Sequence, residues 1–417
     1  MILTIFFILM YEFLCYLLFR NKILLYKNLI KRLTKLNIIF IKIIQWITVD
    51  NGDIELNNIV KNITNNVEYS NEDIDHPLIT DIENYSNNEL VIDRIPINSG
   101  TIALVYKGKL NNKDVIIKMK RKNIKQKLND VVHFLNNIVY IIEHIPFINI
   151  ENYSIKDILK YNMHNFVKQS DFHLEATNIQ IFYNNYINES NIIIPKVYIK
   201  YTNRFDDVIV MEYLDGKHLT EINNNYYDYI LKILYFLNTS LYNHNIIHSD
   251  IHPGNILFMD DKIGIIDFGF VSIINKETGF DIYSFYNYYT SGKRKKLYKL
   301  IVEKLCIKMN NNIIISQDVI DNEYTNFLIF FQDGGPLSHN KHINYNDLKT
   351  INIFFSKINL IISEEFINII LSISPMISLI NFLLNNDSKK TTDTQYYIKD
   401  AFNLLKKTNI PDELINY

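Results

Sequence analysis

The chain has 417 residues, which is enough for two or three regions that each bury a sizeable core. With 43 Lys and Arg against 45 Asp and Glu, the formal net charge is -2, so the sequence indicates no broad basic surface for nucleic acid. Its two cysteines, Cys15 and Cys306, are too few for a disulfide framework or a four-cysteine zinc site.

The first segment, Met1–Phe19, is almost wholly apolar, and Glu12 is its one charged side chain. A helix of this length rises about 28 Å, close to the thickness of the hydrocarbon core of a bilayer. This predicts a membrane anchor, and the basic residues after it would keep the rest of the chain on the cytoplasmic side. The alternative is a buried or interfacial helix, which Glu12 favours. The basic residues are Arg20, Lys22, Lys27, Lys31, Arg32 and Lys35.

A second helix is predicted at Asn37–Ile47, where Lys42 and Gln45 lie three residues apart and therefore share one face. The helix is otherwise apolar, so most of its surface must pack against another element. Ile54–Asn88 is then rich in Asn, Asp, Glu and Ser, which predicts a polar linker or an extended surface segment.

Two strands follow, Ile102–Tyr106 and Val115–Lys118, with Val105 in the first. Small residues precede the first strand at Ser99, Gly100 and Thr101. Backbone amides in such a loop can approach phosphate oxygens, although a single glycine is weak evidence. Lys118 ends an apolar strand of sequence V-I-I-K, which resembles the V-A-I-K strand whose lysine pairs with nucleotide phosphates.

Ile155–Tyr186 has helical periodicity and contains the sequence D-F-H-L-E-A-T-N, in which Glu175 is the candidate partner of Lys118. The alternative for Glu175 is a solvated glutamate on a helix. Strands are predicted at Lys196–Tyr201 and Val208–Glu212. The segment after the second strand predicts a hinge between two lobes, with Glu212 and Leu214 beside a bound adenine.

The stretch His248–Asn255 reads H-S-D-I-H-P-G-N and carries the strongest chemical signal. Asp250 and Asn255 have the spacing of the kinase signature H-x-D-x-x-x-x-N, and Asp267 opens a D-F-G triplet. Asp250 would orient or deprotonate a nucleophile, while Asn255 and Asp267 would bind the Mg²⁺ that accompanies ATP. Two short strands, Ile256–Phe258 and Ile263–Ile266, are predicted between these motifs.

Coincidence and a metal face of histidines are the alternatives for this region. His244, His248 and His252 recur every four residues, which on one helix would resemble a zinc site. Pro253 and Gly254 argue against a helix through the third histidine.

The remainder predicts a helical region. No A-P-E triplet follows D-F-G, so a platform for peptide substrates is doubtful. Phe280–Ser284 opens a helix, and the basic stretch Ser291–Lys299 is a solvated face. Phe366–Leu384 carries no charge, but Pro375, two asparagines and its serines favour a pair of buried helices kinked at the proline over a membrane span.

Together these motifs resemble the UbiB/ADCK family of atypical kinases, which is associated with ubiquinone biosynthesis and isoprenoid-lipid metabolism. H-S-D-I-H-P-G-N is similar to the family's H-A-D-x-H-P-G-N, and Phe40–Gln45 is similar to its K-x-G-Q motif. The resemblance implies that Lys42 and Gln45 reach the nucleotide site, that Lys42 pairs with Asp171 or the phosphates, and that the K-x-G-Q helix partly covers the active site.

Three positions depart from the family pattern. Ile44 replaces the glycine of K-x-G-Q, Gln169 replaces the glutamate of an E-x-D motif, and Asn98–Thr101 replaces an alanine-rich loop. None of these changes removes a catalytic or metal-binding side chain, so the site is predicted to be chemically intact.

The resulting prediction is an α+β, bilobal protein-kinase-like fold with an N-terminal helical extension. Residues 1–20 form the apolar segment, 21–90 the extension, 91–213 the smaller lobe and 214–417 the larger lobe. The predicted function is Mg-ATP binding with transfer or hydrolysis of the γ-phosphate, and membrane or isoprenoid lipid is a further partner. The alternatives are a small-molecule phosphotransferase and a nucleotide-binding pseudokinase.

Overall fold

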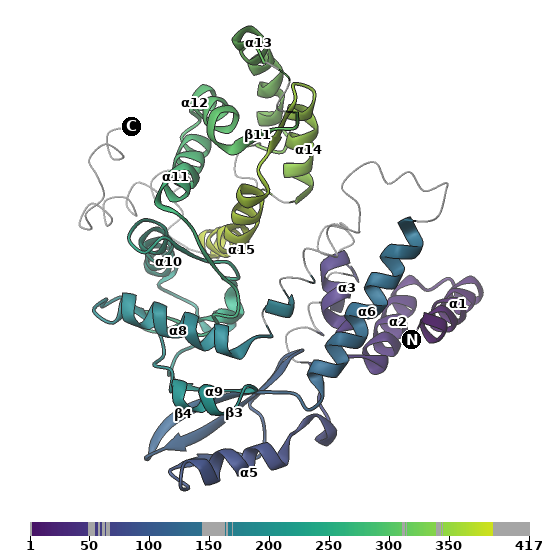
Figure 1. The fold of residues 1–417 in the computed structure, drawn as a ribbon, viewed down its shortest axis with the longest axis vertical. Helices are drawn as coiled ribbons and strands as arrows, with labels where there is room; N and C mark the ends of the chain where they lie inside the picture. The colour runs from purple at the N-terminus through teal and green to yellow at the C-terminus, as the bar shows by residue number, and fades with distance from the viewer. Residues whose placement is uncertain are drawn as a thin grey trace. The chain divides into compact units, whose positions relative to one another are not determined.

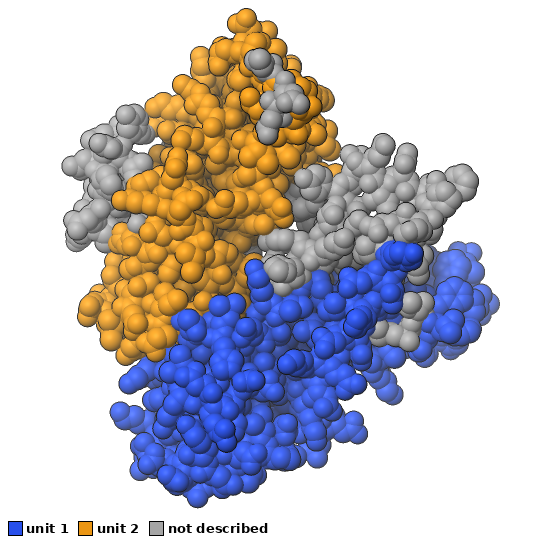
Figure 2. All heavy atoms as spheres, viewed as in Figure 1, with its two compact units in different colours: residues 1–177, 196–213 blue, residues 178–195, 214–417 orange. Residues whose placement is uncertain are grey.

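The computed structural model describes residues 2–48, 67–143, 170–310, 315–338 and 345–386, and, in between, residues 55–56, 59–60, 63, 163, 166–168, 313 and 343. The chain divides into two compact units, coloured separately in Figure 2. Unit 1 comprises residues 1–177 and 196–213, and unit 2 comprises residues 178–195 and 214–417.

The helices and strands of each unit follow in chain order (Figure 1). Unit 1 contains α1 (Ile2–Phe19), α2 (Lys22–Leu36), α3 (Phe40–Thr48), the 3-10 turn η1 (Asn71–Asp73), α5 (His76–Tyr85), β1 (Leu90–Ile92), β2 (Asn98–Ser99), β3 (Ala103–Leu110), β4 (Lys113–Lys120), α6 (Ile124–Glu143), α9 (Ile199–Arg204) and β6 (Val208–Glu212). Helix α8 (Phe172–Tyr186) begins in unit 1 and ends in unit 2. Unit 2 contains β5 (Ile192–Ile193), η2 (Leu219–Glu221), α10 (Tyr226–Tyr242), β7 (Ile246–His248), η3 (Pro253–Asn255), β8 (Ile256–Phe258), β9 (Ile263–Ile265), β10 (Val271–Ile273), α11 (Lys276–Thr290), α12 (Arg294–Leu300), the π-helical turn η4 (Ile301–Leu305), β11 (Cys306–Lys308), α13 (Gln317–Phe327), η5 (Leu328–Phe331), α14 (Tyr345–Ser356), β12 (Leu360–Ile362) and α15 (Glu364–Asn386).

An antiparallel sheet of order β1-β3-β4-β6, with β2 paired to β3, forms the centre of unit 1. Its long β3–β4 hairpin turns at Asn111 and Asn112, whose φ values of 52° and 65° fit the left-handed positions of a tight hairpin turn. The register places Val105 of β3 opposite Lys118 of β4, and Lys118 opposite Ile209 of β6. The hairpin turn therefore sets which β3 residue lies opposite Lys118, whereas the neighbour on β6 depends on a separate strand pairing.

One face of this sheet is buried under helix α5. Tyr106, Ile117 and Met119 belong to the same buried cluster as Ile79 and Ile82 of α5, and Figure 1 shows α5 running along the sheet. The helix starts at Asp75, whose carboxylate accepts a hydrogen bond from the Leu78 N–H. Part of the polar segment 54–88 is therefore a packed helix, unlike the linker that its composition predicts.

Helices α1, α2, α3 and α6 share a second cluster, to which α3 contributes Phe40 and Ile43, with Ile39 directly before the helix. A helix is present within the predicted range 37–47, and its described apolar residues Phe40, Ile41 and Ile43 are buried, as expected. Helix α1 instead exposes most of its large apolar side chains, including Leu3, Phe7 and Leu18. Of the helices in the described ranges, none combines the length and apolarity needed to cross a membrane.

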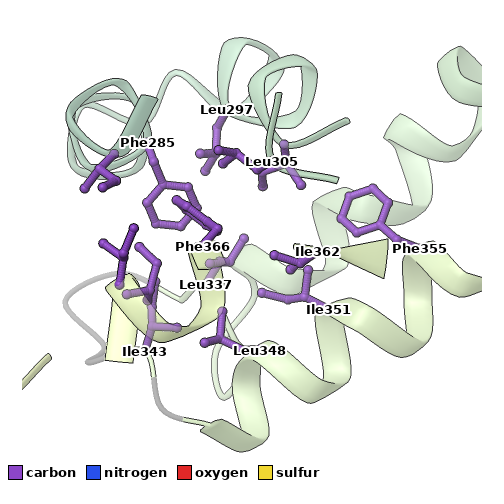
Figure 3. Packing of buried hydrophobic residues seen from close by; sticks show 14 of the residues in the cluster. Phe285, Leu297, Leu305, Leu337, Ile343, Leu348, Ile351, Phe355, Ile362 and Phe366 are labelled. Carbon is purple, nitrogen blue, oxygen red and sulfur yellow. The ribbon is translucent and has the colours of Figure 1, made fainter. Parts of the chain in front are cut away.

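Unit 2 is mainly helical around a large apolar core, part of which Figure 3 shows. Phe285 of α11, Leu297 of α12, Phe355 of α14 and Phe366 of α15 all point into this core. The strands that the structure describes in this unit form three small sheets of order β5-β9-β8, β10-β7 and β11-β12. The apolar segment predicted as two helices is a single helix, α15, and Ile369 and Ile370 are buried in it.

The segment 196–201 differs from its prediction as a strand. Val197 forms only an isolated bridge to Met211, and helix α9 begins at Ile199. Tyr201 and Thr202 of α9 are fully buried, and Tyr201 packs in the cluster beneath the sheet. Burial of this tyrosine outweighs the strand preference of a sequence rich in β-branched and aromatic residues.

Candidate nucleotide site

Lys118 and Glu175 form a closely paired ion pair in unit 1. The Lys118 Nζ lies 2.6 Å from Glu175 Oε1, and the two side chains are only 12% and 4% exposed. Lys118 lies on the sheet face opposite α5, beside Val105 and Ile209. A buried ion pair of this kind holds the lysine at a defined position.

The first turn of α8 sets the position of Glu175. Asp171 caps this helix, because its Oδ1 accepts hydrogen bonds from the N–H groups of His173 and Leu174. The Glu175 N–H donates to the Asp171 carbonyl in the same turn. The sequence D-F-H-L-E therefore combines a helix cap with the glutamate that pairs with Lys118.

The small-residue loop before β3 is a tight turn. Gly100 N–H donates to the Ala103 carbonyl at 2.9 Å, and Thr101 is buried. The Ser99 hydroxyl contacts the Arg121 guanidinium at 2.7 Å, so it faces the interior of unit 1. Backbone groups of the turn, more than the serine side chain, are therefore suited to meet a phosphate.

Two backbone N–H groups at the end of β6 and directly after it already donate hydrogen bonds within unit 1. The Glu212 N–H donates to the Lys196 carbonyl at 2.9 Å, and the Tyr213 N–H donates to the Asp114 carbonyl at 3.3 Å. The adenine contact predicted at Glu212 would therefore use its carbonyl and not its N–H.

Lys42 lies on α3 and is partly exposed, whereas the side chain of Gln45 and all of Gln169 lie outside the described residues. Asp171 is described, and it forms no ion pair with Lys42; its carboxylate caps α8 instead. Of the two partners that the resemblance implies for Lys42, Asp171 is therefore not paired with it, and the nucleotide phosphates stay a prediction.

In unit 2, His248 links the catalytic-loop motif to the D-F-G motif. Its Nδ1 accepts a hydrogen bond from the Asp250 N–H at 3.3 Å, so Nε2 carries the proton and donates to the Asp267 carbonyl. Burial lowers the pKa of His248, which keeps the ring neutral. The three histidines lie on a strand and in turns, which agrees with the argument against a helical metal face.

Asp250 and Asn255 lie on one short loop. The Asn255 Nδ2 donates to the Asp250 carbonyl at 2.8 Å, which leaves the amide oxygen as the atom that can bind a cation. The Asn255 carbonyl accepts from the Ile266 N–H, directly before Asp267. The Asp250 carboxylate is 40% exposed and lies 4.0 Å from His252 Nε2. Unit 2 therefore has one accessible carboxylate, that of Asp250. It also has two side chains on adjacent segments, Asn255 and Asp267, whose oxygen atoms are of the kind that bind a cation.

Residues 80–301, which are more than half of the chain, match the model of the ABC1 atypical kinase-like domain. The chain belongs to the ABC1 family of atypical kinase-like proteins. The resemblance to UbiB/ADCK proteins is thereby confirmed, and so is the α+β, kinase-like fold class.

Relatives of this ABC1 chain carry kinase names. It is 26% identical over 201 residues to Protein ACTIVITY OF BC1 COMPLEX KINASE 3, chloroplastic, of Arabidopsis thaliana, an alignment that covers 45% of this chain and 27% of that protein. It is 26% identical over 172 residues to AarF domain-containing kinase 1 of Drosophila melanogaster, covering 40% of this chain and 32% of that protein. The chain thus spans about a third or less of these relatives. A solved complex of a Mycobacterium tuberculosis protein with erythromycin aligns at 18% identity with a TM-score of 0.42, covering 57% of this chain and 60% of that one.

The donor set of this ABC1 chain fits Mg²⁺ bound together with a nucleotide. Within the described ranges, no group of three or more His, Cys, Asp or Glu side chains is arranged to hold a metal ion. Magnesium commonly takes one or two protein ligands and completes its octahedron with phosphate oxygens and water. Asp267 and the amide oxygen of Asn255 are oxygen donors of the kind that such a site needs.

Two residues that hold these motifs in place, one in each unit, escaped the sequence-based prediction. Asn178 donates from Nδ2 to the Phe268 carbonyl at 2.9 Å and so holds the D-F-G segment within unit 2. Arg121, with a side chain that is 0% exposed, contacts the turn at Ser99 and Gly100. Asn178 ends the D-F-H-L-E-A-T-N sequence and Arg121 follows the V-I-I-K strand. The sequence therefore places both residues next to known motifs, but it does not indicate the groups that they bind.

Proposed function

We propose that this chain binds Mg-ATP and transfers or hydrolyses its γ-phosphate. The ion pair between Lys118 and Glu175 carries the proposal, because a buried lysine fixed by a glutamate is the arrangement that kinases use to hold nucleotide phosphates. The carboxylate and amide donors of unit 2 add the charge and metal ligands that a phosphoryl group requires.

In this proposal each side chain has one task. Lys118 holds the phosphates and Glu175 orients Lys118, while Asp250 orients the hydroxyl or water that receives the phosphoryl group. Asn255 and Asp267 hold Mg²⁺, which neutralises phosphate charge. Backbone groups of the turn at Ser99, Gly100 and Thr101 contact the phosphates. Val105 and the segment Glu212–Leu214 contact the adenine.

The substitution Asp267→Asn tests the proposal. It removes one charged magnesium ligand, so the affinity for Mg-ATP should fall at least about tenfold, a loss of roughly 1.4 kcal/mol. Titration calorimetry with Mg-ATP measures this, and Asp261→Asn in the exposed β8–β9 turn is the matched control. A folded Asp267→Asn protein that binds Mg-ATP as tightly as the wild type would refute the assignment.

We also propose that α1 associates with a membrane surface. Eleven large apolar side chains of α1 are more than a third exposed, which is far more than a monomer in water usually leaves on one helix. Glu12 does not oppose this, since it is buried and its Oε1 accepts from Arg32 Nε of α2 at 2.6 Å. The basic residues of α2 would meet anionic headgroups while α1 meets the acyl boundary.

Vesicle binding tests this association. Phe7→Glu with Leu14→Glu should lower sedimentation with phosphatidylglycerol vesicles more than tenfold, because each apolar side chain contributes about 1.5–3 kcal/mol when buried. Ile273→Glu, at a site in unit 2 that is more exposed than either Phe7 or Leu14, is the control. Equal sedimentation of the double variant and the wild type would exclude α1 as the membrane contact.

A further inference from the structure

The most completely buried cation in the described part of unit 1 is Arg121, at the end of β4. Its side chain is 0% exposed, and its nitrogens reach five groups on two separate segments. Burying a guanidinium is costly unless its donors are satisfied, so the surrounding groups must be held in place as firmly as the arginine itself.

On one side Arg121 holds the turn Ser99–Ile102, which we call the phosphate turn. Nε donates to the Gly100 carbonyl at 2.9 Å, and Nη2 donates to the Ser99 hydroxyl at 2.7 Å. The backbone N–H of Arg121 donates to the Ile102 carbonyl at 2.8 Å. One residue therefore fixes both ends of the phosphate turn.

These contacts determine which way the amides of the turn point. In a trans peptide the C=O and N–H groups point in opposite directions, and no described peptide bond is cis. Because the Gly100 carbonyl points toward Arg121, the Thr101 N–H points away from it. Within the described part of the chain, the Thr101 and Ile102 N–H groups donate to no other group. Unpaired backbone N–H groups in a turn can bind an anion.

On its other side Arg121 holds the segment Val67–Asp73, which lies in the extension that precedes the sheet. Nη1 lies 3.0 Å from Asp73 Oδ2, and Nη2 reaches the carbonyls of Val67 and Glu68. The Val67 N–H in turn donates to the Ser99 carbonyl at 3.0 Å. The extension and the phosphate turn are thus fastened to the same guanidinium.

We propose that Arg121 is a positioning residue that holds the phosphate turn with its Thr101 amide directed toward the nucleotide phosphates, using the segment Val67–Asp73 as its anchor. The inference rests on the proposed nucleotide function and extends it. It makes the N-terminal extension a determinant of phosphate affinity, although no residue of that segment contacts the nucleotide.

Comparing ligands that carry phosphates with adenosine, which carries none, separates a role in positioning the phosphate turn from a general effect on stability. Arg121→Lys keeps the charge but loses the fork of donors, and Asp73→Asn weakens the anchor while leaving the arginine. Affinities for Mg-ATP and Mg-ADP should fall about tenfold in each variant, the scale of one charged hydrogen bond. The affinity for adenosine, measured by displacement of a fluorescent adenine nucleoside, should change less than twofold.

Lys120→Ala is the matched control, because Lys120 neighbours Arg121 but pairs with Asp207 and the Asp206 carbonyl at the surface. Hydrogen exchange of the peptide spanning 97–104 should accelerate in Arg121→Lys and not in Lys120→Ala. Equal losses for ATP and adenosine, or unchanged affinity for ATP in both variants, would overturn the positioning role. A wild-type protein that binds no Mg-ATP would instead overturn the proposed function on which this role rests.

Discussion

At the scale of single residues, unit 1 pairs its cations with buried acceptors. Lys118 meets Glu175, and Arg121 meets Asp73 together with carbonyls of the phosphate turn. Burial of a charged side chain is costly unless polar or charged partners satisfy it, so each of these cations depends on the groups around it. Two cations three residues apart, at the end of β4 and just after it, therefore have different surroundings: Lys118 pairs with Glu175 and is proposed to meet phosphates, whereas Arg121 is enclosed by the chain.

Two glycines, one in β3 and one in the turn before it, provide a residue-level test. A Cβ at Gly100 would meet only the Ala103 carbonyl at 3.5 Å, whereas a Cβ at Gly108 would lie 2.5 Å from the Val91 carbonyl. Gly108→Ala should therefore lower the free energy of unfolding by about 1–3 kcal/mol. Gly100→Ala should leave it within about 0.5 kcal/mol, a typical effect where nothing is displaced, while weakening Mg-ATP binding by crowding the approach of a phosphate.

Denaturant unfolding and calorimetry on the two variants measure these effects. A destabilised Gly100→Ala protein, or one with unchanged affinity for Mg-ATP, would contradict the description of this turn as open to a ligand.

At the scale of elements, Asp73 joins three parts of unit 1. Its carboxylate accepts from the N–H of Ser70, which caps η1, and contacts Arg121 after β4 and Lys127 of α6. Lys122 N–H also donates to the Asp73 carbonyl. Ion pairs and hydrogen bonds thereby connect the polar segment before α5 to the end of the sheet and to α6. Helix α5 itself packs on the sheet through buried apolar side chains.

The stability of this junction should depend on pH. Burial alone would raise the pKa of Asp73, but Ser70, Arg121 and Lys127 together lower it below its usual value. A carboxylate with a lowered folded-state pKa contributes stability that is complete above its unfolded pKa of about 3.9 and is lost as the pH falls through the folded pKa. Asp73→Asn should therefore lower the melting temperature at pH 6, and the difference should shrink below about pH 4.

Thermal melts of the wild type, Asp73→Asn and the exposed α5 variant Asp81→Asn across this pH range make the comparison. A wild-type–Asp73→Asn difference that stays constant down to pH 3 would show that the charge of Asp73 does not stabilise the junction.

At the scale of the whole molecule, the proposed activity draws on both units. Unit 1 contains Lys118 and Glu175, while unit 2 contains Asp250, Asn255 and Asp267. The acceptor of the phosphoryl group does not follow from these residues. An accessible carboxylate such as Asp250 can orient a protein hydroxyl, a small-molecule hydroxyl or water equally well.

The absence of an A-P-E triplet in the sequence leads to a prediction about that acceptor. The chain should bind and turn over ATP but phosphorylate a generic protein such as casein slowly or not at all. Labelled ATP, with phosphate release and protein labelling followed in parallel, measures both. Rapid labelling of casein that Lys42→Ala leaves unchanged would contradict the idea that α3 restricts access by protein substrates.

The sequence by itself determined the local elements and motifs of this protein: the V-I-I-K strand, the turn before it, the loop carrying Asp250 and Asn255, and the D-F-G triplet. Each depends on residues close together in the chain, so its hydrophobic periodicity and turn residues can be identified without knowing the tertiary contacts. The tertiary structure decided the rest. It turned part of a polar segment into α5 and a predicted strand into α9, because burial of Ile79, Ile82 and Tyr201 outweighs local preference. It also joined Arg121 to Gly100 and Asp73, partners that are 21 and 48 residues away and that no local pattern identifies.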